Sequence, residues 1–451
     1  MKNKIDFVKG NTPKCLFAMV MPLLMAMILT MAYNLVDSLW VGNLLGEAGY
    51  AALTNSTAIV LILSAIAMGA SNGAAIIISQ AVGAGKKEEA EGIITTMLVM
   101  AAVFSFGVTV VLELSLKFIL IWMRTPAELF DMAYAYLSIY LIGYIAIFLY
   151  MHFTAVFRSF GDALFQMKGM LLSTIFNAVL DPIMIHGMGL TGAAWATVLS
   201  EVICLVFALF YYSNKKMFKL QIHSIHITHV KALLANAVPA AIQSCMPAIS
   251  SAVMLFLVTG FGITTIAAYG VTSKLEILLF YPAMAMNMGL TTIVGQCVGA
   301  KRLDRVKDYM KCALAGGSIF IAVISALVIA FAKGLTGFFI DSAETAVIVQ
   351  GFFNIVSIGY VLYMITSCYL GELSGMGKPG ISMLLMFIYY IVVRVPLASL
   401  LEHTEFGLNG IWAAILVSHI LAAVLAAFEG IRIEKKMQNA EQISLQHKVA
   451  A

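Results

Sequence analysis

The chain has 451 residues, of which 61% are hydrophobic and only 11% are charged. Apolar stretches of about 20 residues or more, the length that crosses a bilayer, recur from end to end. This composition indicates a polytopic membrane protein rather than a soluble domain. The formal net charge of +4 is mostly a signal of membrane topology. We therefore expect the lipid bilayer, and no nucleic acid, as a partner.

Twelve membrane-spanning helices are predicted, at residues 15–40, 51–82, 93–122, 131–156, 168–187, 190–212, 232–260, 264–298, 309–338, 346–371, 379–400 and 408–430. The first apolar run is too long for a signal peptide and is expected to be retained. Lysine and arginine gather at the N-terminus, in alternate loops and in the C-terminal tail. The positive-inside rule therefore predicts a multi-pass protein of the plasma (inner) membrane with both termini in the cytoplasm.

The two halves of the chain repeat each other. The segment SQAVGAGKKEEAEG begins at Ser79 and GQCVGAKRLDRVKD begins at Gly295, so four residues of the first recur 216 positions later in the second. The same offset relates Gly143 to Gly359, and a shift of one residue relates Pro22 to Pro239. A single register held over so much of the chain indicates a tandem duplication.

Each half has six predicted spans, so both halves enter and leave the membrane in the same sense. We expect an all-α fold of two six-helix lobes, related by a pseudo-two-fold axis along the membrane normal, with the substrate path between them. The predicted divisions are an N-lobe at 1–213, a cytoplasmic linker at 214–230, a C-lobe at 231–432 and a cytoplasmic tail at 433–451.

Four segments carry a resemblance to a known family: YNLVDSLWVGNLLGEAGYAAL from Tyr33, SQAVGAGKKEEA from Ser79, GLTGAAWATVLS from Gly189 and VGQCVGAKRLDRV from Val294. With these motifs the sequence resembles the multidrug and toxic compound extrusion (MATE) transporters along nearly its whole length. The resemblance implies a secondary active efflux transporter, not an enzyme. It would export organic cations or amphipathic small molecules in exchange for H⁺ or Na⁺, by alternating access of the two lobes, without another cofactor and as a monomer.

Within that family the match is nearer to the DinF-type and prokaryotic branch, which places an aspartate site in the N-lobe. The resemblance carries that cation-coupling site onto Asp37, Asn177, Asp181 and Thr197, which are also the ligands expected for Na⁺. Another bacterial pattern of the family has further acidic residues on the seventh and tenth spans. Here the seventh span has no carboxylate, so a cation site in the C-lobe is in doubt.

The residues themselves support such a site. An aspartate in hydrocarbon costs roughly 2.5 to 3.5 kcal/mol on insertion scales, so Asp37 is a functional candidate by default. Asn177 and Asp181 are four apart and share a helix face. At about 1.5 Å per residue from the nearest outer turns, Asp37, Asp181 and Thr197 all lie on the order of 10 Å below the outer surface.

Two carboxylates in a poorly hydrated pocket cannot both stay ionised cheaply, so a proton or a bound cation is expected between them. Oxygen ligands of this kind suit Na⁺ as well as H⁺, and the sequence leaves the choice open. Pro22 and Pro182 interrupt the hydrogen-bond ladders of their helices and are predicted bending points. Tyr33, Asn34 and Glu276 are predicted to line the substrate cavity.

The sequence also admits other interpretations of these residues and of the function. Asp37 and Asp181 could be solvated helix ends near the outer headgroups, and the contributions of Glu201 and Glu276 are undecided. The alternative function is a lipid-linked oligosaccharide flippase of the same superfamily, which would be expected to line its cavity with arginine or lysine to hold a pyrophosphate. Motifs for a metalloprotease, a serine hydrolase or a P-loop are missing from the sequence.

Overall fold

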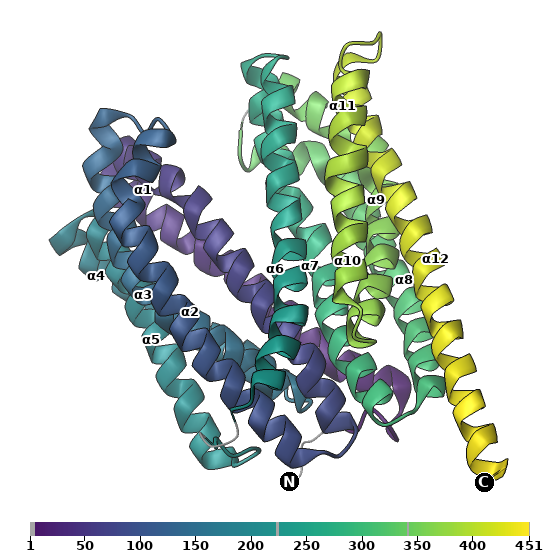
Figure 1. Cartoon of the computed structure of the whole chain (residues 1–451). Coiled ribbons are helices and arrows are strands. Elements are labelled where there is room, and N and C mark those ends of the chain that lie inside the picture. Colours follow the sequence, from purple (N-terminus) through teal and green to yellow (C-terminus); the bar gives the residue numbers. More distant parts are fainter. Residues whose placement is uncertain (1–4, 222–224, 341, 451) are drawn as a thin grey trace. The chain divides into compact units, whose positions relative to one another are not determined.

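The computed structural model describes residues 5–221, 225–340 and 342–450, with no side chains described at 441–442 and 444–450. These residues are almost entirely helical and contain no β-strand (Figure 1). The predicted all-α fold is therefore confirmed. Residues 222–224 of the predicted linker lie outside the described residues.

The helices follow one another with short connections. In chain order they are α1 (Thr12–Gly83), α2 (Lys87–Trp122), α3 (Ala127–Ser159), α4 (Leu164–Met188), α5 (Leu190–Lys215), α6 (Ile227–Thr259), α7 (Ile263–Gly299), α8 (Leu303–Gly337), α9 (Ala343–Gly375), α10 (Pro379–Phe387), η2 (Ile388–Arg394), α11 (Val395–Leu401) and α12 (Gly407–Ala450). Within the described residues, eleven helices are long and apolar enough to cross a membrane, with Pro379–Leu401 taken as one.

Helix α1 contains two of the predicted spans. Its 72 residues would measure about 108 Å as one straight helix, whereas the hydrocarbon core of a bilayer is about 30 Å thick. The helix is interrupted at Gly46, where φ is 68° and ψ is −161°. A positive φ of this kind is readily adopted by glycine, which lacks a Cβ. With α1 divided at Gly46, the described chain has the twelve spans that hydropathy predicts.

The outer faces of the helices are strongly apolar. Leu114 on α2 is 84% exposed, Phe256 on α6 is 74% exposed and Phe338 after α8 is 84% exposed. Large exposed apolar side chains in such numbers are unusual on a soluble protein. They are the expected surface of helices that face lipid, and they agree with the composition of the chain.

Packing divides the chain into two compact units. Unit 1 comprises Met1–Ile5 and Met21–Ala241, and unit 2 comprises Asp6–Val20 and Ile242–Ala451. With α1 counted as two spans, each unit contains six, as the duplication predicts. The chain passes between the units inside α1 and again inside α6. Each passage lies within three residues of a proline of the repeat, Pro22 or Pro239.

The units differ from the predicted lobes, 1–213 and 231–432. The first turns of α1 belong to unit 2, and the first turns of α6 belong to unit 1. The start of α6 joins unit 1 through very close helix packing. A Cβ on Gly69 would lie 2.4 Å from the Cα of Ala241, and a Cβ on Gly73 would lie 2.5 Å from the Cα of Ala237. Glycines four apart let helix backbones approach in this way. The lobe boundaries themselves stay a prediction.

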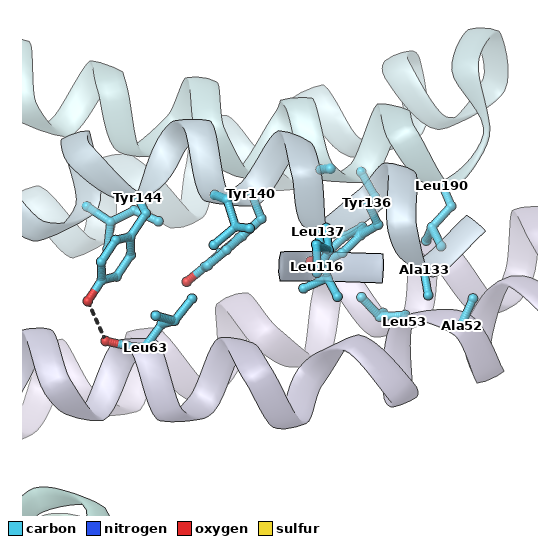
Figure 2. Close-up of a cluster of buried hydrophobic side chains, with 14 of the residues drawn as sticks. Ala52, Leu53, Leu63, Leu116, Ala133, Tyr136, Leu137, Tyr140, Tyr144 and Leu190 are labelled. Carbon is cyan, nitrogen blue, oxygen red and sulfur yellow. Dashed lines mark hydrogen bonds between the residues drawn. The ribbon is translucent and has the colours of Figure 1, made fainter. Parts of the chain in front are cut away.

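The same packing plan is found in both units. In unit 2, α9 packs against α7, α8 and α12, and in unit 1, α3 packs against α2 and α5. Figure 2 shows α3 also facing α1, with Tyr136, Tyr140 and Tyr144 on one side of the helix. The Tyr144 hydroxyl donates to the Leu63 carbonyl at 3.0 Å. The central helices α3 and α9 are thus equivalent members of the repeat.

Both ends of the chain meet the start of α8 within unit 2. The Arg305 guanidinium donates to the carbonyl of Gly10 at 2.6 Å and to the Thr12 hydroxyl at 2.9 Å. Two residues further on, Lys307 lies 3.7 Å from Glu434 on α12. The segments around Gly10 and Glu434, before the first and after the last predicted span, therefore lie at the same end of unit 2, which agrees with an even number of spans.

The close contact between α1 and α6 gives a test of the division into units. We expect Gly73→Ala to lower the free energy of unfolding by about 1–3 kcal/mol, because the new methyl group overpacks against the Ala237 backbone. The measurement is thermal unfolding of the purified protein in detergent. Gly107→Ala on α2 is the control, since a Cβ there meets nothing within 4 Å. Equal stability of both variants would contradict the packing described here.

Candidate functional site

Asp37 on α1 and Asp181 on α4 come together inside unit 1. Asp37 is 8% exposed and Asp181 is fully buried. Their carboxyl groups lie close enough to interact electrostatically. Both side chains are buried among helices, whereas a solvated helix end would be exposed. Their depth in a membrane stays a prediction.

Asn177 joins this group from the turn before Asp181. Its Nδ2 donates to Asp181 Oδ1 at 3.1 Å, as the spacing of four residues on one helix face predicts. Three oxygen atoms of the group are buried without a hydrogen-bond partner: Asp37 Oδ1, Asp181 Oδ2 and Asn177 Oδ1. Oxygens of carboxylates and amides are the ligands that hard cations accept. The residues present therefore fit either a proton or a sodium ion.

Thr197 on α5 lies near Tyr33 of α1, which is one turn before Asp37. The Tyr33 hydroxyl is buried without a hydrogen-bond partner and is close enough to the Asp37 carboxyl group to feel its charge. Thr197 is 7% exposed. The structure thus brings together side chains from α1, α4 and α5, while the ligand role of each stays a prediction.

Sequence reasoning missed Tyr136. This residue lies on α3, is 4% exposed and is close enough to interact electrostatically with both Asp37 and Asp181. One of 17 tyrosines in the chain, it does not stand out by type. Its spacing of four residues from Tyr140 and eight from Tyr144 was the available signal, because that pattern places three hydroxyl groups on one helix face.

The two prolines that are predicted bending points, Pro22 and Pro182, lie at different features of unit 1. Pro22 follows directly on the passage of α1 from unit 2 into unit 1. Pro182 adjoins Asp181 in α4, so the carbonyl of Ala178 loses its usual helical donor beside the acidic pair. Bending at either proline stays a prediction.

The residues predicted to line a substrate cavity have different surroundings. Tyr33 is buried and Asn34 is exposed, both in unit 1. Glu276 belongs to unit 2, where its Oε1 accepts a hydrogen bond from Tyr360 at 2.8 Å. Lys274 lies over the ring of Phe339 at 5.4 Å. A cavity shared by Tyr33, Asn34 and Glu276 remains a prediction.

Unit 2 holds a second buried polar group, centred on Arg394, that the sequence did not single out. The Arg394 Nε donates to Ser418 at 2.9 Å and one of its terminal nitrogens donates to Tyr389 at 2.6 Å. The Tyr389 hydroxyl also lies 2.8 Å from Nδ1 of His419. Arg394 ends the π-helical segment η2, just before Pro396, whose nitrogen cannot donate to the helix.

Twelve apolar spans in two equivalent units, with an acidic pair buried in one unit, are typical of an integral membrane transporter. A sequence model of the MatE family matches the chain twice, at residues 22–183 and 239–400. The first residues of the two matches, 22 and 239, differ by 217, one more than the main register of the repeat. The family match therefore confirms the tandem duplication and covers well over half of the chain.

Similar proteins are known by sequence and by structure. The chain is 25% identical over 427 residues to the "Probable multidrug resistance protein YpnP" of Bacillus subtilis (strain 168), covering 93% of this chain and 95% of that protein. It is 21% identical over 443 residues to the "FAD transporter" of Shewanella oneidensis, covering 96% and 97%. A solved structure described as the outward-facing conformation of a multidrug resistance MATE family transporter has the same fold, with a TM-score of 0.92 at 22% identity over 97% and 99% of the chains.

The chain belongs to the MATE family of multidrug efflux transporters. Members of this family move small molecules across membranes and are not enzymes. The family resemblance read from the four sequence motifs is therefore confirmed. The assignment to a branch with an N-lobe aspartate stays a prediction.

The bond between Asn177 and Asp181 can be tested by stability. We expect Asn177→Leu to lower the free energy of unfolding by about 1–3 kcal/mol, because it removes the donor from a buried carboxyl group. Thermal unfolding in detergent measures the change. Asn34→Leu is the matched control, because Asn34 is exposed. Unchanged stability of Asn177→Leu would show that the bond does not hold the acidic pair.

Proposed function

We propose that this MATE transporter exports organic cations in exchange for H⁺ or Na⁺, with Asp37, Asn177, Asp181 and Thr197 as the coupling site. The observation that carries the proposal is that Asp37 and Asp181 are buried near each other in unit 1, in a group with three oxygen atoms that have no hydrogen-bond partner. Burial of two acidic groups without a counter-charge is costly unless a proton or a cation binds between them. The pair therefore responds to the coupling ion.

Binding of the ion changes the charge at the contact between α1 and α4. Each of these helices carries a proline, Pro22 or Pro182, at which backbone hydrogen bonds are missing and bending is least costly. Loss of the repulsion between Asp37 and Asp181 favours a different bend of α1, and alternating access follows from that change. An ion drives transport in this scheme because it binds one conformation more tightly than the other.

The proposed setting is the plasma (inner) membrane, with a monomer whose termini both face the cytoplasm. Two observations support the orientation. Gly10, before the first span, and Glu434, after the last, both contact the start of α8, and that end of unit 2 carries Lys301, Arg302, Arg305 and Lys307. Basic residues next to spans favour the cytoplasmic side.

A lipid-linked oligosaccharide flippase is the second candidate. Such a transporter needs cationic groups for a pyrophosphate. Two arginines are buried, but each already donates to neutral partners: Arg158 to Asn72 and Gln166 in unit 1, and Arg394 to Tyr389 and Ser418 in unit 2. The acidic pair favours cation exchange over this alternative.

Efflux from proteoliposomes tests the proposal. We expect wild-type protein to move ethidium under a proton gradient or a sodium gradient, applied separately, and Asp37→Asn to lose the gradient-driven component. The reason is that an amide neither binds a proton nor carries the charge that attracts Na⁺. Dye fluorescence measures the rate. Gradient-driven export that is unchanged in Asp37→Asn would contradict the coupling role.

The substrate class is tested in the same vesicles. FAD is included as an anionic compound because one relative is named a FAD transporter, and a fluorescent lipid-linked sugar is included for the flippase alternative. Transport of ethidium without FAD or the sugar supports the proposal. Flipping of the sugar without transport of ethidium would replace it with the second candidate.

A further inference from the structure

Unit 1 also contains the acidic residue Glu201, one helical turn beyond Thr197 on α5. Glu201 lies on α5, four residues after Thr197, so it is about 6 Å further along the same helix face. Its Oε1 accepts a hydrogen bond from the Ser173 hydroxyl at 3.2 Å. Its Oε2 is buried and has no hydrogen-bond partner. Among the described residues, Glu201 forms no ion pair within 4.0 Å.

Two tyrosines of α3 lie near this carboxyl group. Tyr140 and Tyr150 on α3 both lie close enough to feel its charge, and so does the thiol of Cys204 on α5. The Tyr150 hydroxyl is itself buried without a partner, and it faces Gly169 on α4 so closely that a Cβ there would clash with it. The charged and titratable groups around Glu201 are thus acidic or neutral, and none supplies a positive charge.

Tyr33 on α1 is a polar neighbour of both this region and the acidic pair. Its hydroxyl is buried without a hydrogen-bond partner, and it lies close enough to Asp37 and to Glu201 to feel the charge of each.

We propose that Glu201 is a second proton-binding site of unit 1, separate from the Asp37 and Asp181 pair. Binding forms one O–H bond between Oε2 of the Glu201 carboxylate and a proton from the side of the membrane that supplies the proton gradient, so Glu201 ends neutral. Release of the proton breaks the same bond and leaves Glu201 ionised.

The surroundings of Glu201 select a proton over Na⁺. A hard cation binds several oxygen ligands at once, whereas Glu201 has one carboxyl group and the single bonded hydroxyl of Ser173. A proton needs only the free Oε2. The position of Glu201 is that of a group inside the membrane. From the start of α5 at Leu190, Thr197 is about 10 Å along the helix and Glu201 about 16 Å, near the middle of a core about 30 Å thick.

This inference rests on the proposed proton or sodium exchange, and its test keeps the two apart. Wild type, Glu201→Gln, Glu201→Asp, Asp37→Asn and Glu113→Gln are reconstituted in proteoliposomes with a pH dye inside. Ethidium export under a proton gradient is measured together with protons moved per ethidium and with ethidium–ethidium exchange in the absence of a gradient. Glu113 is the matched control, a carboxyl on α2 of the same unit that also has an unpartnered buried oxygen.

We expect Glu201→Gln to slow proton-driven export by about a hundredfold, the low end of the contribution of a positioned proton-transfer group. Ethidium–ethidium exchange should persist, Glu201→Asp should restore part of the driven rate, and Glu113→Gln should behave as wild type. Persistent exchange also shows that Glu201→Gln folds.

Several results would overturn the inference. They are driven export by Glu201→Gln at the wild-type rate and proton ratio, equal loss of driven export and exchange, or wild-type export that responds to sodium alone. Normal export by Glu201→Gln beside a defective Asp37→Asn would remove this inference and leave the proposed function standing. Normal export by Asp37→Asn would instead remove the proposed coupling site.

Discussion

Neutralisation of the acidic charge inside unit 1 is the constraint on which the functional part of this protein depends. An isolated carboxylate among membrane helices is strongly unfavourable, and two in contact are more so. Asp37 and Asp181 are nevertheless buried together, with Asn177 as the one side-chain donor to Asp181 among the described residues. In the proposed function, a proton or a cation compensates this charge and so stabilises the packing of α1, α4 and α5. Stability of this packing and occupancy by the proposed coupling ion would then be linked.

The duplication preserved the packing of the two units but not their polar groups. Helices α3 and α9 have equivalent neighbours, and the family match recurs in both halves. At the 216-residue offset, however, Asp37 corresponds to Val253 and Asp181 to Leu397. Unit 2 instead buries Arg394 with Tyr389 and His419. Apolar packing is tolerant of exchange between similar side chains, whereas a buried charge needs a specific set of partners, so one duplicated scaffold holds two different polar interiors.

Much of the site could be predicted from the sequence because its members are local in the chain or unusual in their setting. Asp37 stands out as an acid in an apolar run, and the four-residue spacing of Asn177 and Asp181 fixes them on one helix face. Counting helical rise predicts one depth for Asp37 and Asp181, and the structure buries the two side chains near each other. Tyr33 on α1 and Tyr136 and Tyr140 on α3 lie near the acidic groups, and residue type alone does not distinguish them from tyrosines elsewhere.

The sequence by itself determined the twelve spans, the tandem duplication and the residues that are costly to bury, because hydropathy and helical periodicity are properties of neighbouring residues. Only the tertiary structure decided where the chain passes between the units and which side chains meet. The start of α6 joins unit 1 because its backbone at Ala241 and Ala237 packs closely against Gly69 and Gly73. A hydropathy pattern does not predict this close packing. Contacts between helices far apart in the chain depend on side-chain shape and orientation, which no local pattern specifies.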